Sequence, residues 1–162
     1  MIATLEPKLV ASLQAAAREI LETMVFLTPT EVSEVPLRSS MLQAEVTGLL
    51  PFTGTRKGTF AVSTTEVLAR TVAAKMLMME PSDLGSFQEA ADGFGEVVNM
   101  IGGNFKNAWV ADGNRMDLST PQVVHNGEIK VDSDKAGSLR SGIRVVLPEG
   151  ELLIGVHFEA AT

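Results

Sequence analysis

The chain has 162 residues, a length at which one domain is the usual expectation and the core needs no disulfide or metal. It contains no cysteine, which excludes disulfides, thiolate nucleophiles and cysteine-ligated zinc. With 13 Lys and Arg against 20 Asp and Glu, the net charge is −7, so the chain lacks the basic surface that nucleic-acid binding requires. No apolar run is long enough to span a membrane, and no signal peptide is visible. We therefore expect a cytoplasmic protein that binds neither nucleic acid nor membrane.

The first half of the chain shows a helical pattern, then strand patterns, then a second helical pattern. Apolar residues recur at helical spacing near the start, which predicts an amphipathic helix. Val, Thr, Leu and Phe then become frequent, and the stretch from Pro51 to Gly58 is typical of a loop within a hairpin. Ser63, followed three residues later by Glu66, has the spacing of a helix-capping box. The ranges expected are 7–24 for the first helix, 31–38, 41–50 and 57–63 for strands, and 64–79 for the second helix.

A third helix and further strands are expected in the second half. Ser86 and Glu89 form another capping pattern after a linker at 80–85, and a helix with a clean apolar stripe extends from there to about Trp109. The strands expected after it are 116–118, 123–124 and 128–131, followed by a terminal hairpin of 139–147 and 152–159. This order predicts an α+β fold in one domain of residues 1–162: a mostly antiparallel β-sheet covered on one face by three main helices.

The third predicted helix carries an unusual polar side. Asp92, Glu96 and Asn99 stand at i, i+4 and i+7, so they share one side of the helix, roughly opposite the apolar stripe. Each glycine inside a helix costs on the order of 1 kcal/mol relative to alanine, and this segment contains several. Gly103 lies on the polar side, where a missing side chain leaves room for a partner to come close. An ordinary solvated face, and a helix broken at its glycines, stay open as explanations.

Residues 92–104 have the sequence D-G-F-G-E-V-V-N-M-I-G-G-N, and Pro121 follows further along the chain. This segment resembles the active-site helix of the CheC/CheX/FliY phosphatase family, whose motif is an Asp or Ser, then E-x-x-N, then a later proline. Asp92, Glu96, Asn99 and Pro121 match the motif. No other Glu has an Asn three residues later, and a single motif makes the chain resemble CheX rather than CheC. The order of the predicted elements fits CheX over nearly the whole chain.

The resemblance implies an activity and a partner. The family dephosphorylates the chemotaxis response regulator CheY, so a phosphorylated CheY-like receiver is the implied partner. Hydrolysis of its aspartyl phosphate needs a water placed in line with the leaving oxygen and cations that neutralise charge. By resemblance, Asn99 orients that water, because a carboxamide offers a donor and an acceptor without titrating. Glu96 would pair with the active-site Lys of the receiver in a charge-assisted hydrogen bond.

The resemblance also assigns supporting parts. Asp92 would hold the helix or contact the partner, and Pro121 would be structural. The chain would need no cofactor of its own, since the receiver supplies Mg²⁺. A homodimer joined through sheet edges is implied, and the long terminal hairpin is a candidate for such an edge.

Two other functions stay open. One is a non-catalytic, receiver-binding adaptor of the flagellar-switch type, which would not need the pair of Glu96 and Asn99. The other is a phosphatase for a two-component receiver outside chemotaxis.

Metal binding is not expected. The segment that begins at Asp132 starts like a calcium loop, but Ala136 and Ile143 stand where ligands are required, so a turn is expected. His125 and His157 lack metal-ligand spacing and are expected at the surface or in packing roles.

Overall fold

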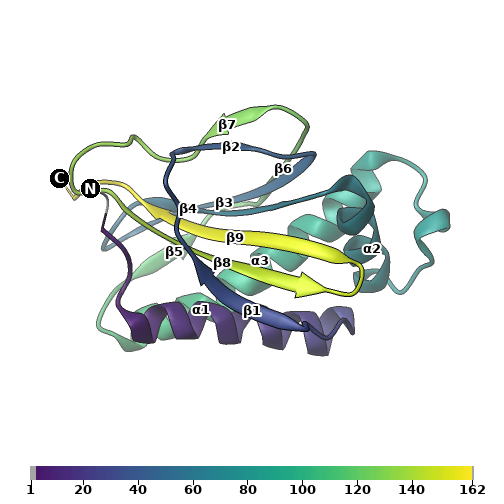
Figure 1. Cartoon of the computed structure of the whole chain (residues 1–162), viewed down its shortest axis with the longest axis horizontal. Helices are drawn as coiled ribbons and strands as arrows, with labels where there is room; N and C mark the ends of the chain where they lie inside the picture. The colour runs from purple at the N-terminus through teal and green to yellow at the C-terminus, as the bar shows by residue number, and fades with distance from the viewer. Residues whose placement is uncertain (1–2, 162) are drawn as a thin grey trace.

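The computed structural model describes residues 3–161, in which three helices lie on one side of a seven-stranded sheet (Figure 1). The helices are α1 (Pro7–Ile20), α2 (Glu66–Met76) and α3 (Phe87–Ala111), with a π-helical turn η1 (Leu21–Val25) after α1 and a 3-10 turn η2 (Pro81–Asp83) after α2. The strands are β1 (Glu31–Val35), β2 (Met41–Gln43), β3 (Val46–Gly54), β4 (Gly58–Thr64), β5 (Met116–Leu118), β6 (Gln122–His125), β7 (Glu128–Lys130), β8 (Leu139–Leu147) and β9 (Gly150–Phe158). Every pairing between these strands is antiparallel, which confirms the predicted fold class.

Alternation along the strands gives the sheet one apolar face, and α3 lies directly on it. Phe105 of α3 meets Phe60 of β4 edge-on, with 5.6 Å between ring centroids. At Gly102 the approach is so close that an added Cβ would lie 2.5 Å from a methyl carbon of Leu50. The two outer helices pack beside α3, and the amide of Asn104 donates to the carboxylate of Glu19 on α1 at 2.8 Å. In residues 3–161 no helix has the length and apolar character needed to cross a lipid bilayer.

The terminal hairpin lies inside the sheet. The strand order is β1-β8-β9-β4-β3-β5, with β6 also paired to β3, so β8 and β9 each have two neighbours. The expectation that this hairpin offers a free edge is therefore wrong, because β1, which comes from far earlier in the chain, pairs along β8 from Glu31 to Val35. In the described part of the chain the edges are β1 on one side and β5 and β6 on the other.

The expected loop at 51–58 is shorter than predicted, because β3 continues through Pro51 to Gly54. Proline lacks the N–H that a central strand uses, and it is tolerated where no partner needs that donor. Pro51 stands opposite the break between β6, which pairs with Val46–Leu49, and β5, which pairs with Phe52–Gly54. Its carbonyl accepts from the N–H of Ser119 at 2.8 Å.

The start of the second helix also differs from the prediction. Ser63 belongs to β4, and the residue that caps α2 is Thr65, whose hydroxyl accepts from the N–H of Leu68 at 3.2 Å. Glu66 does not form the predicted capping box with Ser63. It pairs instead with Arg70, with 2.9 Å between Oε2 and Nε.

A buried ion network lies on the sheet face opposite the helices. Asp132 and His157 are buried, and the Asp132 carboxylate accepts from Arg140 at 2.7 and 2.9 Å and pairs with His157 Nδ1 at 2.9 Å. Arg140 also pairs with Asp134. Asp132 does lie in a bend, as predicted, but its side chain points into the protein, where it anchors the segment that carries β7. Leu37 and Leu42 cover the same face beside Ala61 and Gly155.

Candidate functional site

The helix that carries the motif is continuous. α3 has 25 residues and is not broken at its glycines. The predicted cap is confirmed: the hydroxyl of Ser86 accepts from the N–H of Glu89 at 3.4 Å, and the Glu89 carboxylate accepts from the N–H of Gly85 at 3.4 Å. α3 starts at a cap and packs on the sheet along its length. The backbone positions of the residues on its outer side are therefore well defined.

The outer side of α3 carries what we call the polar ridge, defined as Asp92, Glu96, Asn99 and Gly103. Asp92 and Glu96 are exposed, while Asn99 and Gly103 are half-buried. Asn99 follows Glu96 by three positions, which is about 4.5 Å along the helix axis. Neither side chain is tied to another residue of the range 3–161 by a hydrogen bond or ion pair, so both are available to a partner.

Asp92 is tied within its own helix. Its carboxylate accepts a hydrogen bond of 2.8 Å from the amide of Gln88, one turn earlier. The role of Gln88 was not predicted, although its four-residue spacing to Asp92 is a signal that the sequence contains.

The glycines of α3 differ in what surrounds them. A Cβ added to Gly93 would lie 2.9 Å from the Cβ of Ala73 on α2, and one added to Gly95 would lie 3.8 Å from the Pro121 ring. A Cβ on Gly103 would have no atom within 4 Å. The structure therefore places Pro121 against the helix at the residue before Glu96, and it leaves the ridge open at Gly103.

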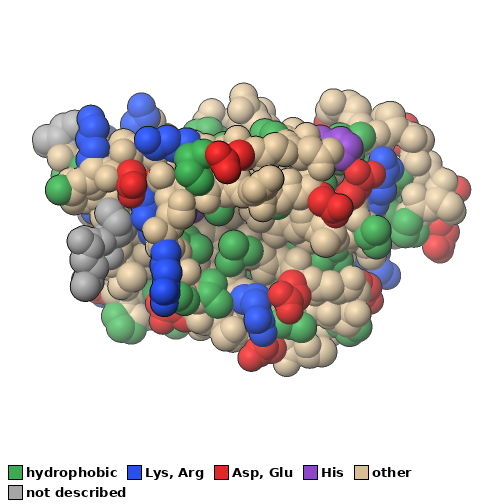
Figure 2. All heavy atoms as spheres, turned by 45° about the horizontal axis from the view of Figure 1, so that its top comes forward, with side chains coloured by type: hydrophobic (Ala, Val, Ile, Leu, Met, Phe, Trp, Pro, Cys, Tyr) green, Lys and Arg blue, Asp and Glu red, His purple; other side chains and the backbone are tan. Residues whose placement is uncertain are grey.

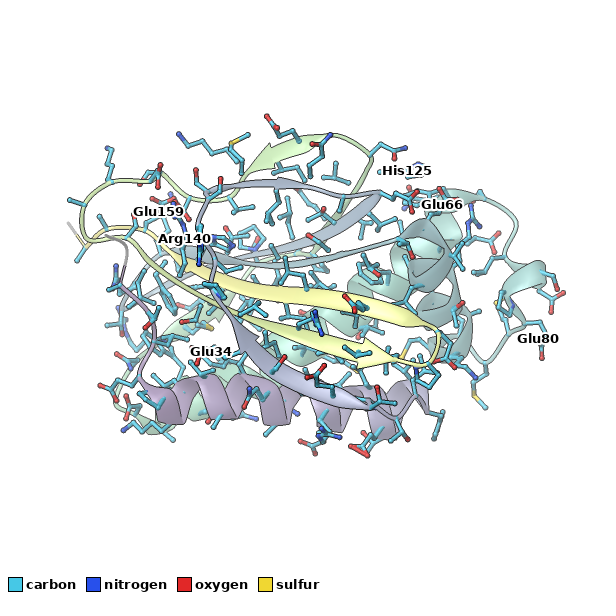
Figure 3. The ribbon with its side chains drawn as sticks, in the orientation of Figure 1. Glu34, Glu66, Glu80, His125, Arg140 and Glu159 are labelled. Atoms are coloured by element: carbon cyan, nitrogen blue, oxygen red, sulfur yellow. The ribbon has the colours of Figure 1, made fainter. Side chains whose placement is uncertain are left out.

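A polar cluster ties β6 to the starts of α2 and α3. The ring of His125 stacks on Phe87, with centroids 3.8 Å apart and planes 8° from parallel. His125 Nε2 lies 2.5 Å from Oε1 of Glu66, and Figure 3 shows the two residues together. Hydrogen bonds from Arg70 and from His125 lower the pKa of Glu66.

This cluster was missed at the sequence level, because Phe87 looked like a core residue and His125 had no partner at short range. The space-filling view shows a histidine at the surface beside acidic and basic side chains (Figure 2). The exposed His125 agrees with the expectation of a surface position. His157, in contrast, is buried and pairs with Asp132.

No metal centre is apparent in the described range. Among residues 3–161, no group of three or more His, Asp or Glu side chains is placed so that it could hold a metal ion.

Comparison with known families gives a match to the model of the chemotaxis phosphatase CheX over residues 46–140, which is more than half of the chain. The chain belongs to the CheX family. The match includes α2, α3 and β6, and with them every residue of the polar ridge and Pro121. A comparison with curated proteins finds no match.

Solved structures of CheX and of a putative chemotaxis protein share this fold. A putative chemotaxis protein from Desulfovibrio vulgaris Hildenborough is 22% identical, with a TM-score of 0.81 over 97% of this chain and 100% of that one. CheX from Desulfovibrio desulfuricans is 23% identical, with a TM-score of 0.78 over 94% and 99%. CheX in a CheX–CheY–BeF3–Mg²⁺ complex from Borrelia burgdorferi is 20% identical, with a TM-score of 0.75 over 93% and 97%. At these identities the likeness shows a common fold.

Proposed function

We propose that this CheX-family chain hydrolyses the aspartyl phosphate of a CheY-like response regulator. One observation carries the proposal. On the outer side of α3, the amide of Asn99 and the carboxylate of Glu96 lie next to each other, and neither forms a hydrogen bond or ion pair within residues 3–161. Family membership supports the activity, and the Borrelia burgdorferi CheX bound to CheY supports the class of partner. We infer that residues 1–162 act as one phosphatase domain.

Asn99 acts by placing water. In the proposed complex its carboxamide enters the receiver site and holds a water in line with the bond between phosphorus and the aspartyl oxygen, accepting from the water with its carbonyl oxygen. The glutamine of small GTPases has a comparable role on another fold. Fixed orientation of reactants can remove up to about 7–11 kcal/mol of a barrier, so positioning alone accounts for a large acceleration.

Glu96 acts by docking. Its exposed carboxylate is one turn before Asn99 and pairs with the active-site Lys of the receiver. Such a charge-assisted hydrogen bond is roughly twice as strong as a neutral one and fixes the register of the two proteins. Asp92 is held by Gln88 and borders the docking surface, while Pro121 supports the helix at Gly95.

The remaining parts of the reaction come from the partner. We assign the Mg²⁺ and the Lys that neutralise the developing charge to the receiver, so the chain contributes no cofactor. A cytoplasmic location and a homodimer stay predictions. If the dimer forms through a sheet edge, β1 is the candidate on the side of the terminal hairpin.

The test is phosphate release from a phosphorylated CheY-like receiver in Mg²⁺ with substoichiometric amounts of this protein. Wild type should accelerate release with turnover. Asn99→Ala should reduce release to the rate of the receiver alone, and Glu96→Ala should mainly raise the receiver concentration needed for half-maximal rate. Gln43→Ala, which removes an exposed carboxamide from β2, is the matched control and should behave as wild type.

Full activity of Asn99→Ala would show that the amide does not position the water. Binding of the phosphorylated receiver without any hydrolysis would identify an adaptor of the flagellar-switch type. Hydrolysis confined to receivers from outside chemotaxis would place the enzyme in another two-component pathway.

A further inference from the structure

The C-terminal ends of two helical segments meet around a hollow with exposed apolar side chains. The hollow has a volume of about 460 Å³ and lies between η1 and the end of α2, with Phe26, Met78 and Met79 among its lining residues. Phe26 is 70% exposed and Met78 is 89% exposed. No residue of the polar ridge lines the hollow, so it is a second surface.

Both exposed side chains stand at backbone positions that favour glycine. Phe26 ends η1 with φ 61° and ψ 35°, and Met78 follows α2 with φ 59°. After α2, the N–H of Met79 donates to the carbonyl of Ala74 at 2.8 Å and that of Met78 to Lys75 at 3.1 Å. In this pattern of helix ending the left-handed residue is usually glycine, since other residues are strained there. Packing within the chain does not explain two large apolar side chains that are both strained and exposed.

The surroundings of the hollow are negative. The C-terminal end of a helix carries a partial negative charge, and two helical segments end here. Glu80 and Asp83 line the hollow from the η2 region, and neither forms an ion pair within residues 3–161. Figure 3 shows Glu80 at the outer margin of the molecule. Lys75 also lines the hollow, in the last turn of α2, where a cation offsets the charge of that helix end.

We propose that this hollow docks a basic amphipathic helix of a partner protein. The apolar side chains of such a helix would cover Phe26 and Met78, and its Lys or Arg residues would face Glu80, Asp83 and the two helix ends. Both exposed side chains would become buried in the complex. The free energy gained by that burial would offset the cost of holding Phe26 and Met78 in a strained backbone conformation.

The probe is a synthetic peptide of about 15 residues, the length at which an isolated helix begins to form in water. It carries leucines three and four positions apart on one face and lysines on the other. A second peptide with glutamates in place of the lysines tests the charge requirement. Isothermal titration calorimetry against the full chain measures the dissociation constants, and analytical ultracentrifugation measures self-association.

The variants separate docking from folding. Phe26→Gly and Met78→Gly remove the apolar side chains at positions that suit glycine, so the melting temperature should stay the same or rise. Each should weaken binding of the lysine peptide by about tenfold or more, because a buried Phe or Met side chain contributes at least that factor. Val67→Ala is the matched control: it truncates a 73% exposed apolar residue at the other end of α2 and should leave binding unchanged.

Three results would overturn the proposal. The first is equal binding of the lysine peptide to wild type and to both glycine variants. The second is equal binding of the glutamate peptide. The third is concentration-dependent self-association that both glycine variants abolish, which would make a second copy of this chain the occupant.

Discussion

Gly103→Ala tests whether the polar ridge is open and whether a partner uses that opening. Gly103 lies inside α3, and a Cβ at this position would meet no atom within 4 Å. The change therefore adds no clash, and alanine is favoured over glycine in a helix interior by about 0.8–1 kcal/mol. For a chain of this length we expect the melting temperature to rise by about 2–4 °C.

Two other glycines of α3, Gly102 and Gly93, lie on packed sides of the helix and serve as controls. In Gly102→Ala the new Cβ would lie 2.5 Å from Leu50, a fully buried residue, and overpacking of a core costs about 1–3 kcal/mol. In Gly93→Ala it would lie 2.9 Å from the Cβ and 3.0 Å from the Cα of Ala73, so α2 itself would have to move. Both variants should melt below wild type, with the larger loss at Gly93.

Thermal unfolding followed by circular dichroism gives the stability order, and phosphate release from a phosphorylated receiver gives the activity. If a receiver backbone comes close to Gly103, the added methyl group should lower the rate of phosphate release at limiting receiver, although the variant protein is more stable. Destabilisation of Gly103→Ala to the level of Gly102→Ala would refute the open ridge. Greater stability with unchanged activity would refute the docking role of Gly103.

The remaining predictions concern stability. Asp132→Ala leaves the buried Arg140 without its main partner, so urea unfolding should show a loss of about 3–5 kcal/mol. Burial lowers the pKa of His157 below 6.5, so the unfolded chain binds more protons and the free energy of unfolding should decrease as the pH falls below about 6.5. Burial would raise the pKa of Asp132, but hydrogen bonds from Arg140 and His157 outweigh it and hold that pKa below 3.8. The free energy of unfolding should therefore decrease a second time below about pH 4. A free energy of unfolding that stays constant from about pH 7.5 to 3 would contradict both pH predictions. Ser86→Ala removes the cap of α3 and should cost about 1 kcal/mol in thermal unfolding, whereas Ser82→Ala should have little effect.

The features predicted well from the sequence are those that depend on short-range patterns. The shared side of Asp92, Glu96 and Asn99 follows from helical periodicity alone, and the cap at Ser86 depends on a residue only three positions away. The predicted cap at Ser63 is wrong, because Thr65, two residues later, is equally able to cap a helix and caps α2.

The features missed from the sequence are contacts between distant segments. The stack of His125 on Phe87 joins a strand to a helix start, and the partner of His157 is 25 residues away at Asp132. Pairing of β1 with β8 joins segments more than 100 residues apart, so it places the terminal hairpin inside the sheet against the expectation. Periodicity and capping patterns depend on residues close in the sequence, so they do not predict which distant segments pack against each other.

The close packing of α3 has a consequence for how the proposed activity would be controlled. Because α3 approaches α2 at Gly93 and the sheet at Gly102 so closely, the helix backbone that carries Asn99 cannot shift unless the core is disturbed. Under the proposed function, the position from which Asn99 reaches the receiver is therefore set when the polypeptide folds. Under the same proposal, we expect the rate to be modulated at the encounter of the two proteins, through the phosphorylation state of the receiver or through competition for the outer side of the helix.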